Sequence, residues 1–161
     1  ILAIDEKTKT LISVEAKTDE FFSNDDFLNA LKKAIKEKKK NNNSKQVERL
    51  LGLYKNFFNC NDEIINLRHQ LLYWFAGSIA EAKRREMKNI ILLNQVFKYK
   101  ELSEKKLKKN HQDFEDFIAL VSNGKISEIS SNKIYGPINN EYTKDVDVYF
   151  IEESINGERL D

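Results

Sequence analysis

The sequence predicts an α/β domain with a mixed central β-sheet flanked by helices. Apolar, β-branched runs near both ends and in the middle of the chain predict strands, and apolar residues at helical spacing fill the stretches between them. No internal repeat or linker divides the 161 residues, which is a length suited to one domain with its own core. We therefore expect a single domain over residues 1–161. Because the chain opens with an apolar run typical of a strand interior, we also expect further residues before it.

A β-hairpin is expected over residues 1 to 17. Two apolar runs, Ile1–Ile4 and Thr10–Lys17, are separated by the polar stretch Asp5–Lys9. Because side chains alternate along a strand, Glu15 and Lys17 project from the same face. A carboxylate beside an ammonium at the end of an apolar strand can hold a divalent cation and a phosphate together.

Four helices are expected after the hairpin. Ser23–Asp26 offers N-cap residues for a helix that reaches about Lys36, and the polar run Glu37–Asn43 predicts an exposed loop. The other three helices, the last with Gly124 as its C-cap, are expected over Ser44–Asn59, Asp62–Lys88 and Ser103–Ser122.

Two further strands complete the predicted sheet. Asn89–Phe97 is largely apolar, a pattern typical of a strand that is buried on both faces of an α/β sheet. Asp145–Ile151 alternates between polar and apolar residues and is expected at an edge of the sheet. Residues 125 to 143, which lie before it, are expected to be irregular.

Composition limits the classes of partner. The net charge is +1, from 27 basic and 26 acidic residues, so a nucleic acid would have to be held by local basic patches. The lysine runs Lys36–Lys40 and Lys105–Lys109 could contact a phosphate backbone, although solvated helix faces are the more ordinary reading. No apolar run reaches the roughly 18 residues of a spanning helix, so no membrane contact is expected. The single cysteine, Cys60, fits a cytoplasmic location.

Two longer stretches carry a family resemblance. Val14–Phe22 reads VEAKTDEFF, and Leu67–Leu72 reads LRHQLL and continues to Ala80–Ala82. Together they resemble an uncharacterised bacterial and phage family of the PD-(D/E)XK nuclease superfamily, which carries a "VEAKxDE" strand and an "LRxQLL" helix. The resemblance extends from the hairpin to Phe97. It implies a restriction-endonuclease-like fold and a nuclease that hydrolyses phosphodiester bonds of nucleic acid, DNA in the first place, with Mg²⁺ or Mn²⁺.

The resemblance also implies roles for single residues. Glu15 would be a metal ligand, Lys17 would position or activate water, and the carbonyl of Ala16 could complete the site. Some superfamily members carry a glutamine and a tyrosine on a later helix near the site. Gln70 matches the glutamine, whereas Tyr73 is three residues on, and the usual spacing of four falls on Trp74.

Arg68 belongs to the same motif. It could contact a phosphate, or it could pair with a carboxylate such as Asp19 or Glu20. These two acids could bind a second metal ion, but an ordinary acidic loop is the more common reading. His69 and His111 are far apart in the sequence, so we expect surface or packed histidines rather than a metal site.

The superfamily also uses an aspartate on the first hairpin strand, and Asp5 is the only aspartate ahead of Glu15. If the turn spans residues 6 to 9, Asp5 pairs with Thr10 and lies roughly 16 Å from Glu15, on the other face. We therefore expect Asp5 to be a turn residue and the metal-binding aspartate to precede Ile1.

Two other functions stay open. The chain could be a non-catalytic member of the same fold that acts as a binding or assembly module. Alternatively, Glu15 and Lys17 could form a structural ion pair in a domain for protein–protein contact. The sequence leaves both a monomer and a homo-oligomer open.

Overall fold

The computed structural model describes residues 1–18, 20–98 and 103–156. Its centre is a five-stranded mixed sheet with the strand order β1-β2-β3-β5-β4. Strands β2, β3 and β5 run parallel in the middle, while β1 and β4 pair antiparallel at the two edges. The strands are β1 (Leu2–Asp5), β2 (Thr10–Lys17), β3 (Asn89–Lys98), β4 (Ile134–Ile138) and β5 (Asp147–Asn156). The expected mixed α/β architecture is therefore confirmed.

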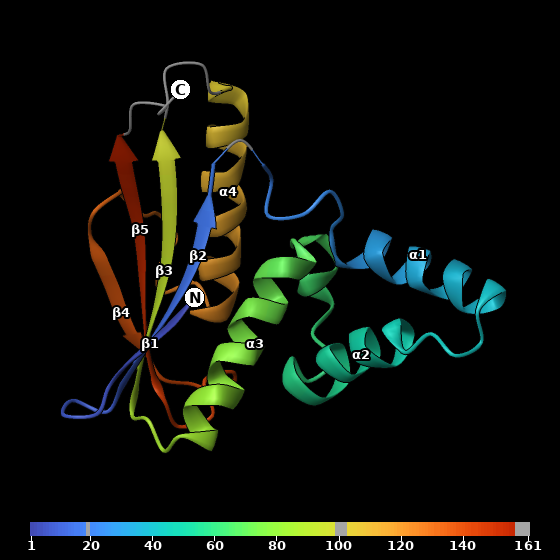
Figure 1. The fold of residues 1–161 in the computed structure, drawn as a ribbon, viewed down its shortest axis with the longest axis horizontal. Helices are drawn as coiled ribbons and strands as arrows, with labels where there is room; N and C mark the ends of the chain where they lie inside the picture. The colour runs from blue at the N-terminus through green and yellow to red at the C-terminus, as the bar shows by residue number, and fades with distance from the viewer. Residues whose placement is uncertain (19, 99–102, 157–161) are drawn as a thin grey trace.

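Two long helices, α3 (His69–Arg84) and α4 (Glu104–Val121), pack against one face of the sheet (Figure 1). Helices α1 (Phe27–Lys40) and α2 (Gln46–Gly52) lie beyond α3, away from the sheet. The core fills the space between the sheet and the two long helices. There Phe117 of α4 meets Phe150 of β5 edge-to-face, with ring centroids 6.3 Å apart.

Strand β3 is buried on one face only, so the prediction that both faces are buried is wrong. Its even-numbered residues, from Ile90 to Val96, are buried against the helices, whereas Ile91 and Leu93 on the other face are half-buried. β-Branched and large apolar residues also suit half-exposed strand positions. An apolar run in the sequence therefore does not show whether helices cover the strand on one face or on both.

The hairpin has the register that the sequence predicts. Asp5 pairs with Thr10, and Ile1 exchanges backbone hydrogen bonds of 2.8 and 3.0 Å with Val14. The Asp5 carboxylate accepts hydrogen bonds from the Thr8 hydroxyl at 2.7 Å and from the Lys7 amide at 2.9 Å. The bond from Thr8 is the main reason that the pKa of Asp5 lies below its ordinary value. Asp5 thus ends β1 and its side chain stabilises the turn, five positions away from the level of Glu15.

The long helix expected over Asp62–Lys88 is interrupted. Asp62–Asn66 forms a 3₁₀ turn, Leu67 and Arg68 are extended, and α3 starts only at His69. The Leu67 carbonyl accepts a hydrogen bond of 2.8 Å from the amide of Phe27, a contact that a continuous helix could not offer. The interruption moves Gln70 into the first turn of α3, at the end that faces the carboxyl end of β2.

Other boundaries shift less. Helix α1 starts after Asp26, which caps the Asn29 amide at 2.7 Å, and runs past the expected end to Lys40. The second expected helix is α2 followed by a π-helical turn, Leu53–Phe57. Helix α4 agrees with its prediction, and the Gly124 amide bonds to the Ala119 carbonyl at 2.8 Å with a φ of 74°.

The last strand differs most from its prediction. β5 continues to Asn156 and lies between β3 and β4, so it is not an edge strand. The edge position belongs to β4, which forms within the stretch that was expected to be irregular. Gly136 and Pro137 make β4 poor in strand-forming residues, and pairing with β5 determines its structure.

Candidate functional site

Glu15 and Lys17 form an ion pair at the carboxyl end of β2. The Lys17 Nζ lies 2.9 Å from the Glu15 Oε1. The Lys17 side chain is only 3% exposed, while that of Glu15 is 23% exposed. The alternation of β2 therefore brings the two charges to one face as predicted, with the ammonium buried and the carboxylate reaching towards solvent.

Gln70 of α3 contacts both members of the pair. Its Nε2 donates a 2.7 Å hydrogen bond to the Glu15 Oε1, and its Oε1 accepts a 3.3 Å hydrogen bond from the Lys17 Nζ. The carboxylate requires a donor and the ammonium requires an acceptor, so the two partners together fix the orientation of the amide. Three of the residues that the family resemblance assigns to the site, Glu15, Lys17 and Gln70, thus meet in one cluster.

Helix α3 is held on β2 by further polar contacts at helical spacing. Four residues after Gln70, the Trp74 Nε1 donates to the Ser13 hydroxyl at 2.8 Å. After four more residues, the Ser78 hydroxyl donates to the same Ser13 oxygen at 2.8 Å. Because these residues share one face of the helix, they fix the position of Gln70 over Glu15. Trp74 therefore packs against the sheet next to the cluster.

A second carboxylate approaches Lys17 from the loop after β2. The Glu20 Oε1 lies 3.7 Å from the Lys17 Nζ, and the buried Phe22 ring lies 5.3 Å from the same nitrogen. Glu20 itself is well exposed, with 65% of its side chain accessible. Lys17 is thus surrounded by two carboxylates, an amide oxygen and an aromatic face, which together offset the loss of hydration of a buried ammonium.

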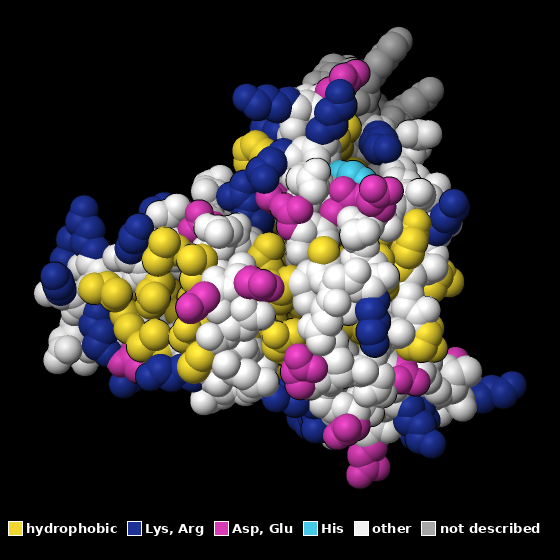
Figure 2. All heavy atoms as spheres, turned by 180° about the vertical axis from the view of Figure 1, so that it is seen from behind, with side chains coloured by type: hydrophobic (Ala, Val, Ile, Leu, Met, Phe, Trp, Pro, Cys, Tyr) yellow, Lys and Arg dark blue, Asp and Glu magenta, His cyan; other side chains and the backbone are white. Residues whose placement is uncertain are grey.

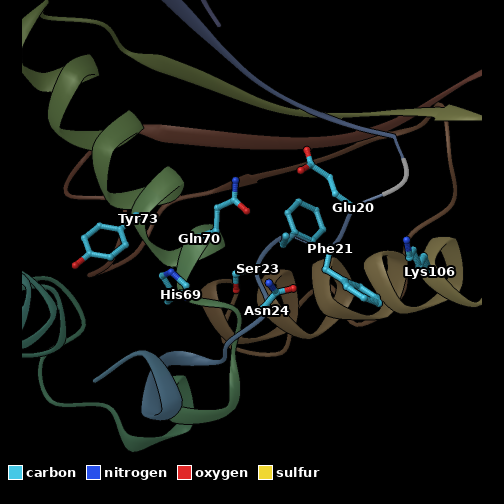
Figure 3. A pocket seen from close by; sticks show the side chains of 9 residues that line it. Glu20, Phe21, Ser23, Asn24, His69, Gln70, Tyr73 and Lys106 are labelled. Carbon is cyan, nitrogen blue, oxygen red and sulfur yellow. The ribbon is translucent and has the colours of Figure 1, made fainter. Parts of the chain in front are cut away.

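A cavity of about 650 Å³ opens beside the cluster, and both Gln70 of the cluster and the neighbouring Glu20 line it (Figure 3). Tyr73 also lines the cavity; it is 38% exposed, and partial desolvation raises the pKa of its hydroxyl. In Figure 3 the Tyr73 side chain points away from Glu20. The lining consists of Glu20, Phe21, Phe22, Ser23, Asn24, His69, Gln70, Tyr73 and Lys106. This volume is in the range of small-ligand sites.

Arg68 pairs with a carboxylate, which is one of the two roles expected for it, and the partner is Asp113. The Nε of Arg68 lies 2.8 Å from the Oδ2 of Asp113, a buried residue of α4. Asp113 also pairs with Lys109 at 2.7 Å. The pairing with Glu20 is not found, and Asp19 lies outside the described residues. Arg68 ties the start of α3 to α4, and a contact between Arg68 and a phosphate stays a prediction.

The oxygen donors at the cluster are few. In the described ranges, no group of three or more His, Cys, Asp or Glu side chains could hold a metal ion. The contacts of Glu15 with Gln70 and Lys17 are made by its Oε1, which leaves its Oε2 as the oxygen for a cation. Because the amide and the carbonyl of Val14 both bond to Ile1, alternation turns the Ala16 carbonyl to the same edge of β2.

These donors can fill only part of the coordination shell of a hard divalent cation. Mg²⁺ is commonly bound by one or two carboxylates, while waters and substrate phosphate oxygens fill the remaining positions. Glu15 Oε2 and the Ala16 carbonyl can supply such a partial set, with Glu20 close by. The residues present therefore fit a cation that is shared with water and phosphate rather than one enclosed by the protein.

A second polar group on the same sheet face was missed by the sequence reasoning. Glu152 of β5 is buried, and it accepts hydrogen bonds from Asn94 at 3.1 Å and from His111 at 2.8 Å. The predicted strand ended at Ile151, so Glu152 was left out. The alternation of Val148 and Phe150 as buried residues could have shown it, because Glu152 continues that pattern.

Charge on the surface is mixed. Figure 2 shows Lys and Arg side chains in small groups over the visible face, interspersed with acidic ones. Near the cavity, the Lys106 Nζ lies 6.0 Å from the centre of the Phe21 ring. None of the helices in the described ranges has the length and apolar character needed to cross a bilayer.

Fold and site together define an α/β domain with a glutamate–lysine–glutamine cluster at the end of a parallel strand. The chain belongs to the family described as Domain of unknown function (DUF6946), whose model matches residues 1–154. The comparison with curated proteins and the comparison with solved structures gave no match.

Proposed function

We propose that the protein is a metal-dependent nuclease of the restriction-endonuclease-like fold, which hydrolyses phosphodiester bonds of nucleic acid with Mg²⁺ or Mn²⁺. One observation carries the proposal: the buried Lys17 ammonium is held by both Glu15 and Gln70 at the carboxyl end of a parallel strand, beside a cavity. In α/β sheets, ligands bind at this end of the strands.

The contacts give each residue a distinct task. Glu15 uses Oε1 to hold Gln70 and Lys17, and keeps Oε2 for a cation. Gln70 fixes the directions of the other two side chains. Lys17 places its ammonium beside the carboxylate that would hold the cation, so that it would orient an attacking water or stabilise a phosphate oxygen. A bound divalent cation would supply Lewis-acid stabilisation of the phosphate and a more acidic water.

A purely structural ion pair explains these contacts less well. Burying an ammonium and a carboxylate costs several kcal/mol per ion, and apolar residues of similar volume would stabilise a core equally well or better. Here the pair is kept, a third polar side chain orients it, and the carboxylate remains partly exposed. A non-catalytic binding module would share all of these contacts and would differ only in turnover.

Cleavage assays separate these functions. End-labelled single- and double-stranded DNA and RNA are incubated with the protein in Mg²⁺, Mn²⁺ or EDTA. We expect cleavage of at least one substrate, dependent on the metal, and a loss of about 100-fold or more in rate for Glu15→Gln and Lys17→Met.

The hairpin provides matched controls. Glu6 and Lys9 form an exposed ion pair of 2.7 Å at the turn, so Glu6→Gln and Lys9→Met change the same charges away from the site. We expect both to cleave as the wild type does, and thermal denaturation verifies folding of all four variants. Absence of metal-dependent cleavage by the wild type on every substrate would overturn the proposal and favour the binding module. Cleavage that survives Glu15→Gln and Lys17→Met would overturn the assignment of the site.

A further inference from the structure

Asn94 is a fully buried amide with an unused acceptor. The side chain lies at the centre of the sheet, on the face that α3 and α4 cover, and is 0% exposed. Its Nδ2 donates to the Glu152 Oε2 at 3.1 Å, whereas its Oδ1 has no hydrogen-bond partner among the described residues. Leaving a buried acceptor unpaired destabilises the folded state, because the group loses its hydration without gaining a hydrogen bond.

The carboxylate of Glu152 determines which atom of the Asn94 amide is left without a partner. Glu152 is held through its Oε1 by His111 at 2.8 Å and by Ser131 at 3.4 Å, so the position of the carboxylate is set from the β5 side. A carboxylate accepts hydrogen bonds, so the amide nitrogen of Asn94 must face it. Exchanging the nitrogen and oxygen would put two acceptors together. The Oδ1 is therefore turned away from β5.

The strand on the other side of Asn94 carries Glu15. Asn94 is the direct register partner of Glu15 in the parallel pair of β2 and β3, so both side chains leave the sheet on the same face. Neighbouring strands lie about 4.8 Å apart, which brings the two side chains within reach of one ion. In this structure Lys17 does not donate to the Oδ1 of Asn94; its ammonium contacts Glu15, Gln70 and Glu20 instead.

We propose that the Oδ1 of Asn94 is a second oxygen ligand of the divalent cation that Glu15 binds. The inference rests on the proposed function, since it deepens the metal site of that function. A neutral amide oxygen is a good ligand for a hard cation. The cation would then have two protein oxygen ligands from side chains: the carboxylate of Glu15 and the amide oxygen of Asn94 on the middle strand of the sheet. Glu152 then acts as a positioning residue that holds the amide.

Binding of Mn²⁺ alone tests this assignment without any substrate. The free-ion electron paramagnetic resonance signal measures how much Mn²⁺ the wild type takes up during a titration. We expect the wild type to bind Mn²⁺ at one site and Glu15→Gln to lose this binding. The dissociation constant of Asn94→Leu should be at least tenfold higher than that of the wild type. Circular dichroism and urea denaturation verify that each variant is folded.

The next residue of β3 offers a matched control. Gln95 donates to Glu153 of β5 at 2.8 Å, the same arrangement as Asn94 and Glu152 but on the opposite face of the sheet. Gln95→Leu should therefore bind Mn²⁺ as the wild type does. If Asn94→Leu also binds as the wild type does while Glu15→Gln does not, the inference is overturned and the proposed metal site stands. If the wild type takes up no Mn²⁺, both are overturned.

Discussion

The Nε2 of Gln70 donates a hydrogen bond of 2.7 Å to the Oε1 of Glu15, between residues 55 positions apart in the chain. The bond joins the first turn of α3 to the end of β2. Any shift of the helix along the sheet would therefore change the direction of the carboxylate. The same amide also accepts from Lys17, so one side chain orients both charges of the cluster.

Replacing Gln70 should destabilise the fold and the site together. Gln70→Leu keeps the volume but removes hydrogen bonds to two charged groups, so we expect the free energy of unfolding to fall by about 1–3 kcal/mol. Urea denaturation measures it. Gln112→Leu removes an exposed hydrogen bond between Gln112 and Asp116 on α4 and should change stability by less than about 0.5 kcal/mol. Equal losses in both variants would contradict a special role for Gln70.

The ion pair of Glu15 and Lys17 should be coupled more strongly than a surface pair. A double-mutant cycle with Glu15→Gln and Lys17→Met should give a coupling free energy of about 1–3 kcal/mol, because the ammonium is almost fully buried. The cycle with Glu6→Gln and Lys9→Met should give at most about 1 kcal/mol, because both side chains are exposed. Denaturant unfolding measures all six variants and the wild type. A coupling at Glu15 no larger than at Glu6 would show that burial adds nothing to the pair.

Replacing each of two glycines by alanine should change the stability of the fold in opposite directions. Gly136 in β4 has a φ of 118°, and an added Cβ would lie 2.6 Å from the Val148 carbonyl oxygen, so Gly136→Ala should cost about 2 kcal/mol or more. Gly77 lies inside α3 with open space around the Cβ position, and Gly77→Ala should gain about 0.5–1 kcal/mol. Thermal and urea denaturation compare the two. A neutral Gly136→Ala would show that β4 does not have the described register.

Stability should change at alkaline pH through Tyr54. The hydrogen bond of 2.6 Å to Asp62 raises the pKa of Tyr54 to about 12 from an ordinary value near 10. Because the folded-state pKa is the higher one, the bond contributes fully below pH 10, and its contribution is lost as the pH rises towards 12. The stability difference between wild type and Tyr54→Phe should therefore be constant below pH 10 and shrink above it.

Urea denaturation at a series of pH values measures this difference. Asp62→Asn keeps an acceptor but removes the charge, and should return the pKa of Tyr54 towards 10. A stability difference that is independent of pH up to 12 would contradict the contact between Tyr54 and Asp62.

Local patterns in the sequence were sufficient for part of the fold. The polar stretch between two apolar runs fixed the hairpin and its register, which excluded Asp5 from the level of Glu15. Strand alternation alone placed Glu15 and Lys17 on one face. The meeting of Gln70 with this pair required the family resemblance, because no local pattern relates residues 15 and 70.

Tertiary contacts determined the features that the sequence did not predict. The break before α3 depends on a hydrogen bond between Leu67 and Phe27, which apolar periodicity does not reveal. The position of β5 inside the sheet depends on its pairing with β4, whose own residues favour a loop. Arg68 pairs with Asp113 because α3 and α4 are adjacent on the sheet, a relation that only the folded chain shows.

The rate of cleavage by Glu15→Gln, relative to that of Glu6→Gln, tests the central claim most directly. Both variants remove one carboxylate charge from the same hairpin, but only Glu15 contacts Lys17 and Gln70. Single-turnover cleavage is measured in saturating Mg²⁺ on the nucleic acid that the wild type cuts. We predict wild-type rates for Glu6→Gln and rates at least about 100-fold lower for Glu15→Gln. Equal rates for the two folded variants would contradict the claim that this cluster is the catalytic site.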